Sequence, residues 1–219
     1  RAVPEVSLGK TGITTSRIGL GMATWLHTRP FEQAVEVFRT AFDIGVRHLD
    51  NAAKYDTEKT VGAVLAETGV PDDAVFTSKV CTYYDEQLGI TYQSFSQDGV
   101  ARSVERSLKL LGREYLDIVY IHDLREINIP GIFSERGPLV TLGELKRQGL
   151  VKAIGMATRN LDSLLVAVTS GEFDVIQTFH LNTLLNREAH RELYPLARAA
   201  HVPVLDSGPY AGYILATGP

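Results

Sequence analysis

Short apolar runs alternate with longer amphipathic runs along most of the chain, and the pair recurs every ~25–35 residues. The apolar runs have the length of buried strands, as at 74–78 and 115–121. The amphipathic runs repeat their apolar positions at the period of a helix, as at Val100, Val104 and Leu108. Strands that alternate with helices predict an α/β protein built on a parallel sheet.

Glycines, prolines and capping residues divide the chain into predicted elements. Strands are predicted at 18–22, 46–49, 74–78, 115–121, 151–156, 174–179 and 202–205. Helices are predicted at 31–44, 57–69, 98–111, 138–148, 160–171 and 186–197, with caps at Thr57, Asn160 and Asn186. The turn at 9–12 predicts a hairpin before the first strand, while 83–97 and 125–136 are predicted as connections.

This order favours a (β/α)8 TIM barrel with an N-terminal hairpin. About seven β/α units are present or begun, whereas a closed barrel has eight and typically ~250 residues. We therefore predict one domain over residues 1–219 that is incomplete at its C-terminus. Either the native protein continues beyond Pro219, or the chain is complete and covers its open edge with another element or with a subunit; in the second case a homo-oligomer is possible. Arg1 is not an initiator methionine, so we expect the start to be processed, tagged or trimmed.

Composition narrows the partners and the compartment. The chain has 219 residues, of which 44% are hydrophobic and 22% charged, with a net charge of −4. This balance predicts a globular protein and gives no reason to expect nucleic acid or an anionic membrane as partner. Cys81 is the one cysteine, so no intramolecular disulfide is possible, which suits a reducing, cytoplasmic setting. We find no bilayer-length apolar run and no secretory signal.

Four reactive side chains fall at or just past the ends of three successive predicted strands. They are Asp50, Tyr55, Lys79 and His122. Taken singly, each has an ordinary structural explanation: a turn aspartate, a packing aromatic, a surface lysine and a hydrogen-bonded histidine. In a parallel barrel, however, the carboxyl ends of the strands share one rim, where active sites are built. The coincidence on one rim therefore favours a catalytic site.

The chemistry that this set suits is a tuned phenol. An ordinary tyrosine has a pKa of about 10 and is a poor acid–base catalyst at neutral pH. A lysine ammonium about 4 Å away, at an effective dielectric near 20, would favour phenolate by up to ~4 kcal/mol. Asp50 can orient Lys79 and keep it charged, and His122 can hydrogen-bond the substrate oxygen beside Tyr55. Such a site protonates a carbonyl oxygen, and a bound nicotinamide would supply the hydride that it lacks.

Together with these four residues, several short motifs resemble the aldo-keto reductase superfamily. They are Leu8–Gly12, Ile18–Gly21, Arg106–Leu111, Leu145–Gly149 and Ile154–Gly155. The ending at 214–219 looks like the aldose and pyridoxal dehydrogenase branch. The resemblance implies a barrel that uses NADP or NAD to interconvert a carbonyl and its alcohol or lactone. It implies Tyr55 as general acid, His122 as orienting donor, and Lys79 with Asp50 as the tuning pair.

The resemblance also implies where cofactor and substrate would lie. Cofactor-binding residues are expected at Gly21, Met22, Asp50, Thr158, Asn160, Gln177 and Ser207. Trp25 and His180 follow predicted strands and are candidates for the substrate pocket, although packing roles are at least as common for such residues. The remaining histidines show no ligand spacing, so no metal site is predicted. No GxGxxG fingerprint follows a strand, which disfavours a Rossmann fold.

Three departures from the family's pattern leave alternatives open. Ala157–Asn160 replaces the usual Ser-Asn after the fifth strand, Asp206 is expected where an aromatic often stacks on nicotinamide, and the final β/α unit that carries much of the phosphate site is absent. We therefore expect cofactor binding to be less secure than the tetrad. A cofactor-independent lyase, dehydratase or isomerase could use the same four residues, and a non-catalytic barrel is the third possibility.

Overall fold

A parallel sheet of seven strands forms the centre of the computed structural model, which describes residues 2–23, 25–85, 87–122 and 129–211. The strand order is β11-β10-β9-β8-β5-β4-β3. These strands are β3 (Gly19–Gly21), β4 (His48–Asp50), β5 (Val75–Val80), β8 (Leu116–His122), β9 (Val151–Thr158), β10 (Val175–Phe179) and β11 (Val204–Ser207). Neighbouring strands follow one another along the chain, so each connection is a β/α step.

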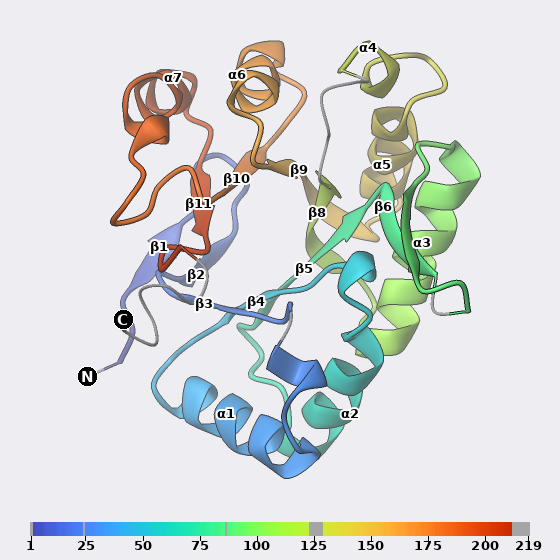
Figure 1. Ribbon diagram of the computed structural model, residues 1–219, viewed down its shortest axis with the longest axis vertical. Helices are drawn as coiled ribbons and strands as arrows, with labels where there is room; N and C mark the ends of the chain where they lie inside the picture. The colour runs from blue at the N-terminus through green and yellow to red at the C-terminus, as the bar shows by residue number, and fades with distance from the viewer. Residues whose placement is uncertain (1, 24, 86, 123–128, 212–219) are drawn as a thin grey trace.

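Helices lie around the outside of the curled sheet (Figure 1). They are α1 (Phe31–Asp43), α2 (Glu58–Thr68), α3 (Gln97–Leu111), α4 (Ile129–Ile132), α5 (Pro138–Arg147), α6 (Leu161–Ser170) and α7 (Leu193–Ala200). Three short 3-10 turns are η1 (Trp25–His27), η2 (Ala53–Tyr55) and η3 (Glu188–His190). The predicted (β/α)8 barrel with about seven units is confirmed, because strands run parallel in one curled sheet and helices cover its outer face.

Two apolar clusters follow from the alternation of side chains along each strand. On β8, Val119 and Ile121 belong to the large cluster between sheet and helices. Ile118 and Tyr120 belong to a smaller cluster on the other face, inside the barrel. The turn of the N-terminal hairpin contributes Leu8 and Ile13 to this inner cluster, so the hairpin closes the interior from one end.

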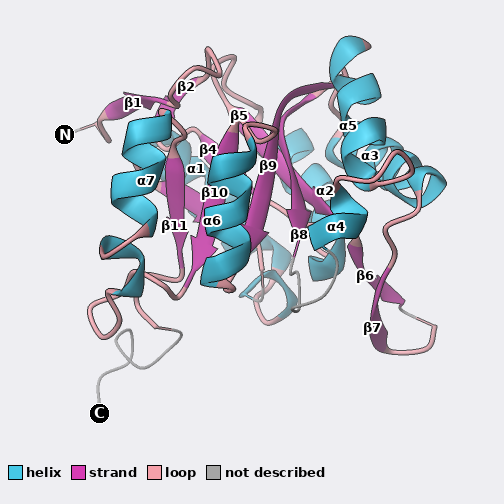
Figure 2. Cartoon of the chain, turned by 90° about the horizontal axis from the view of Figure 1, so that it is seen from above, coloured by secondary structure: helices cyan, strands magenta, loops and turns pink. Residues whose placement is uncertain are grey.

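Two hairpins lie at opposite ends of the strands (Figure 2). The first, β1 (Glu5–Ser7) with β2 (Thr14–Ser16), was predicted from the turn at 9–12 and is confirmed. The second, β6 (Thr82–Asp85) with β7 (Ile90–Gln93), lies where a polar connection was predicted. It stands at the carboxyl ends of the strands, next to the rim where the reactive residues are expected.

Other boundaries differ from the prediction for local reasons. Thr57 stands at the N-terminus of α2, but its hydroxyl donates to the backbone oxygen of Met22 and makes no cap. Asn186 accepts from the backbone of Glu188 in the short turn η3, and the predicted helix begins only at Leu193. The Asn160 cap is confirmed by a 2.8 Å bond from the Ser163 backbone. None of the described helices has both the length and the apolarity to cross a bilayer.

Candidate active site

The four candidate catalytic residues come together at the carboxyl ends of three adjacent strands. Asp50 ends β4, Lys79 is the last residue but one of β5, and His122 ends β8. Tyr55 ends the turn η2 that follows β4. The strand order places β4, β5 and β8 side by side, so their ends converge on one part of the rim.

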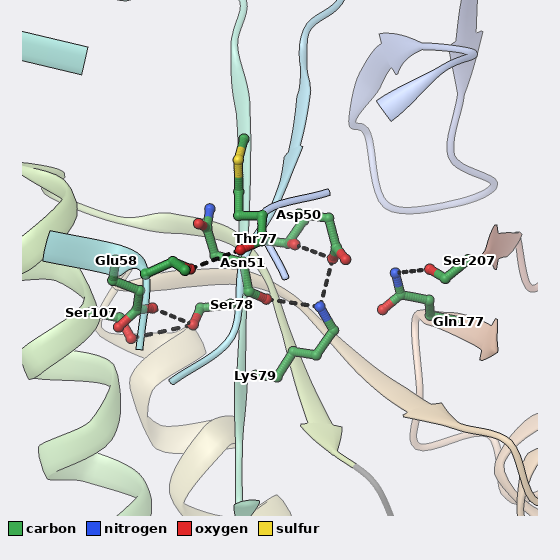
Figure 3. A network of polar contacts seen from close by, with 11 residues as sticks. Asp50, Asn51, Glu58, Thr77, Ser78, Lys79, Ser107, Gln177 and Ser207 are labelled. Atoms are coloured by element: carbon green, nitrogen blue, oxygen red, sulfur yellow. Dashed lines mark hydrogen bonds and ion pairs between the residues drawn. The ribbon is translucent and has the colours of Figure 1, made fainter. Parts of the chain in front are cut away.

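Lys79 is held by a dense set of polar contacts (Figure 3). Its Nζ lies 2.8 Å from Asp50 Oδ1 and 2.8 Å from the backbone oxygen of Asn51. The hydroxyl of Thr77 donates to the same Asp50 oxygen at 2.8 Å. Thr77 and Lys79 are two residues apart on β5 and therefore project from one face of the strand. The side chain of Lys79 is only 2% exposed, so its position is fixed.

The opposite charges of Asp50 and Lys79 offset the cost of burying each of them. Burial alone would raise the pKa of Asp50, but the Lys79 ammonium beside it holds that pKa below its ordinary value. Burial alone would lower the pKa of Lys79, but the charge of Asp50, with the hydroxyl of Tyr55, raises it above the ordinary value. Lys79 is therefore a cation and Asp50 an anion at neutral pH.

Tyr55 and His122 form the open side of this arrangement. Lys79 Nζ lies 5.0 Å from the centroid of the Tyr55 ring. The rings of Tyr55 and His122 meet edge to face, with centroids 5.9 Å apart and planes at 88°. Tyr55, Lys79 and His122 all line one cavity of about 190 Å³. The arrangement thus presents a phenol and an imidazole to whatever enters the cavity, with a buried ammonium behind them.

The segment that carries Tyr55 is tied to its surroundings on both sides. His27 Nε2 lies 2.7 Å from the backbone oxygen of Tyr55. Three residues further on, the buried carboxylate of Glu58 accepts a 2.7 Å bond from the hydroxyl of Ser78, the neighbour of Lys79 (Figure 3). The loop bearing the phenol is therefore fastened to the strand bearing the ammonium.

A polar corner formed by Gln177 and Ser207 lies across the cavity. Gln177 Nε2 donates to Ser207 Oγ at 2.6 Å, and both side chains line the cavity. Gln177 Oε1 is buried and has no hydrogen-bond partner among the described residues, on the side of the amide turned toward Lys79 in Figure 3. A buried polar atom without a partner is costly, and a ligand N–H would satisfy it. These residues therefore fit the amide of a nicotinamide.

The other predicted ligand-binding residues divide into two groups. Thr158 is buried and lines the cavity. Gly21, Met22, Asn160, Trp25 and His180 are not among the described residues that line it. The structure places Met22 in the outer core and Asn160 at the cap of α6. Trp25 lies 6.5 Å from Phe38 of α1, ring to ring, and its Nε1 donates to Gly21.

Asp206 was expected to face the nicotinamide position, but side chains alternate between the two faces of β11 and that of Asp206 lies on the other face. Its carboxylate accepts bonds from Thr178, Asn182 and the Tyr194 hydroxyl of α7, which places it on the helix-facing side of the strand. The next residue, Ser207, is the one that reaches the cavity. The predicted negative charge beside the nicotinamide position is therefore wrong. The ending at 214–219, which suggested a branch of the family, lies outside the described residues.

Several lining residues were not among the candidate site residues of the sequence-based prediction. They are Ala23, Lys54, Ala157, Arg159, Thr178 and Phe179. Alternation from Gln177 along β10 would have found Phe179, since both face the interior, and alternation back from Lys79 would have found Thr77. Among the described residues, no group of three or more histidine, cysteine, aspartate or glutamate side chains is placed to hold a metal ion.

Comparison with known proteins gives a consistent result. The aldo/keto reductase family profile matches residues 17–218. Over 97% of its length the chain is 29% identical to L-galactose dehydrogenase from Arabidopsis thaliana, and over 89% it is 29% identical to NADH-specific methylglyoxal reductase from Escherichia coli. It spans 67% and 63% of those proteins, about two thirds of each. A solved aldo-keto reductase from Bacillus halodurans shares the fold, with a TM-score of 0.84 over 99% of this chain and 70% of that one, at 20% identity.

Proposed function

The chain belongs to the aldo/keto reductase family, and from this premise we propose that it interconverts a carbonyl compound and its alcohol or lactone. The substrate would be an aldehyde, a ketone or a sugar hemiacetal, and the cofactor NADPH or NADH. The family and the named relatives support oxidoreductase chemistry; the substrate, the choice of cofactor and the residue roles are our proposals. Cytoplasmic location and homo-oligomerisation stay predictions.

The observation that carries the proposal is the buried Lys79–Asp50 pair behind Tyr55. In the direction of reduction, Tyr55 would give its proton to the carbonyl oxygen as negative charge develops there. The ammonium of Lys79, 5.0 Å from the phenol ring, would stabilise the phenolate that remains. Asp50 keeps Lys79 charged and oriented through the 2.8 Å contact. His122, edge-on to the phenol, would donate a second hydrogen bond to the same oxygen.

The cofactor would be held at its nicotinamide end by the corner opposite Tyr55. Gln177 and Ser207, with Thr158 beside them, offer the polar atoms that a carboxamide needs. When bound there, a nicotinamide supplies or accepts the hydride. The chain's own residues would do the rest: they orient the amide, hold the carbonyl oxygen and move one proton at the Tyr55 hydroxyl.

The direct test is turnover by the purified chain. NADPH and NADH would each be combined with a set of aldehydes, ketones and aldoses, and oxidation of the cofactor followed at 340 nm. We expect reduction of at least one aldehyde with one cofactor. A parallel incubation without cofactor tests the acid–base alternative, because a lyase, dehydratase or isomerase would still convert its substrate. Tight cofactor binding without any turnover would instead favour a non-catalytic barrel.

A further inference from the structure

Among the described residues that line the cavity there is one arginine, Arg159, on the side of the proposed carboxamide corner. Arg159 follows β9 directly and lines the cavity together with Thr158 and Phe179. Its guanidinium carbon lies 5.2 Å from the centroid of the Phe179 ring. Stacking on an aromatic face orients a guanidinium while its N–H groups stay available at the edge.

The aromatic platform under Arg159 is itself fixed. The rings of Phe179 and His180 stack with centroids 3.8 Å apart. The backbone of His180 adopts a φ of 61°, and its carbonyl oxygen accepts a 3.0 Å bond from Asn186. Gly208 allows this approach, because a Cβ there would lie 2.5 Å from the His180 ring. The guanidinium therefore rests on a preorganised surface, which reduces the entropy lost when it binds a ligand.

The charge of Arg159 is not neutralised within the described structure. Arg159 has no ion pair with any described carboxylate, and no described aspartate or glutamate lines the cavity. Lys79 is matched by Asp50, and the carboxylate of Asp206 is engaged by Tyr194 on the outer face of β11. Burial and the nearby guanidinium both lower the pKa of His180, which disfavours a second positive charge on this platform.

We propose that Arg159 is an anion-binding residue of this cavity. Its guanidinium would receive a carboxylate or phosphate carried by the bound ligand at a distance from the reacting carbonyl. The planar fork of an arginine matches both groups in a bidentate contact. This inference rests on the proposed function, because the anion belongs either to the carbonyl substrate, as a carboxylate, or to the nicotinamide cofactor, as a phosphate.

The test compares Arg159→Gln with Arg159→Lys and with the control Arg102→Gln, which removes an exposed arginine from α3, outside the cavity. One arm measures the dissociation constant of NADPH by fluorescence at low and high salt. The other measures kcat/KM for 4-carboxybenzaldehyde and for its neutral analogue 4-formylbenzamide. A charge-assisted contact predicts a loss of about 10-fold to 100-fold in one arm for Arg159→Gln. Arg159→Lys should recover part of it.

Each outcome has a distinct meaning. If Arg159→Gln binds NADPH more weakly than wild type at low salt, and the difference becomes smaller at high salt, the result supports a phosphate at Arg159. If Arg159→Gln loses a wild-type preference in kcat/KM for 4-carboxybenzaldehyde over 4-formylbenzamide, the result supports a substrate carboxylate at Arg159. Changes below about twofold in both arms, equal to those of Arg102→Gln, would overturn the inference. If the wild type binds NADPH but reduces neither aldehyde nor any other carbonyl, the proposed function fails, and the binding arm alone decides the role of Arg159. A wild type with neither binding nor turnover would overturn both.

Discussion

Tyr55 is the residue on which the proposed chemistry depends most directly. We expect Tyr55→Phe to lower kcat by about 10²–10⁴-fold, because general acid–base catalysis contributes on that scale. The fold should persist, since the ring and its edge-to-face contact with His122 are retained. Steady-state kinetics with circular dichroism as the folding control provides the measurement. Turnover within a few-fold of wild type would remove Tyr55 from the mechanism.

Lys79 should act through the acidity of that phenol. In Lys79→Met the cation 5.0 Å from the Tyr55 ring is lost, so the phenol should ionise at higher pH. The pH optimum for alcohol oxidation, which needs the phenolate as base, should therefore move upward and the rate near neutrality should fall. The pH–rate profiles of both proteins test this. A variant that remains active with an unchanged profile would show that Lys79 does not tune the phenol.

At this scale the sequence located some residues well and others poorly. Asp50, Lys79 and His122 were found because each ends a recognisable apolar strand, and strand ends share a rim. Asp206 was expected beside the nicotinamide because it follows the last predicted strand, where the resemblance places an aromatic; that position along the chain does not settle which face of a short edge strand a side chain takes. Arg159 had no predicted role, because its platform is made by Phe179 from another strand.

Substitutions at two glycines inside helices can distinguish the effect of close packing on stability from the effect of helix propensity. A Cβ at Gly62 of α2 would overlap the backbone oxygen of Leu110 in α3, which cannot move aside. A Cβ at Gly143 of α5 meets nothing within 4 Å. We expect Gly62→Ala to destabilise the fold by about 1–3 kcal/mol through overpacking. Gly143→Ala should stabilise it by about 0.5–1 kcal/mol, because alanine favours a helix.

Urea unfolding of both variants measures the two free energies of unfolding. The pair is matched, because each variant adds one methyl group to the interior of a helix. Equal stabilisation by both substitutions would show that α2 and α3 do not approach as closely as described.

Glu58 of α2 accepts a hydrogen bond from Ser78 of β5, and we expect its contribution to the stability of the fold to depend on pH. Its burial raises the pKa of the carboxyl, while the hydroxyls of Ser107 and Ser78 and the charge of Arg106 partly oppose the shift. The native state therefore holds this proton more tightly than the unfolded state. The stability contributed by Glu58 is present below its ordinary pKa of 4.5 and is lost as pH rises through the native value.

Glu58→Gln keeps an oxygen for Ser78 without the titration. We therefore expect the free energy of unfolding of this variant, relative to that of wild type, to increase as pH rises above 4.5, because only the wild type loses stability there. The control is Glu67→Gln, which removes an exposed carboxylate from the same helix. Denaturation at several pH values gives the comparison. A difference that is flat with pH would mean that Glu58 titrates normally.

Elements were predicted best where apolar periodicity is strong. The helix at 98–111 and the strand at 115–121 lie within one residue of α3 and β8. The hairpin of β6 and β7 was missed because β7 is exposed along its whole length and β6 has only one buried residue, so neither strand carries a repeating buried face. The predicted helix after Asn186 is interrupted before Leu193, where the chain forms a 3-10 turn first.

Across the whole molecule, the central strands of the sheet are more completely buried than the outer strands. Every residue of β5 is buried, as are all residues of β8 except His122. In the described part of the chain β3 and β11 each have one neighbour, and β11 has no fully buried residue. The number of units and the parallel order could be predicted from periodicity. The burial and pairing of the two outer strands could not, because they depend on contacts between segments that no local pattern encodes.

Hydrogen exchange should therefore vary across the sheet. We expect amides of β5 and β8 to exchange most slowly, at rates set by global unfolding, and those of β3 and β11 to exchange faster through local opening. An outer strand leaves half of its backbone groups without a partner strand and loses fewer contacts when it separates. Mass spectrometry of exchanged peptides resolves these segments. Equal protection of β11 and β8 would show that a further segment or a second copy covers the edge. Repeating the exchange at two protein concentrations separates those cases, because only protection by a second copy weakens on dilution.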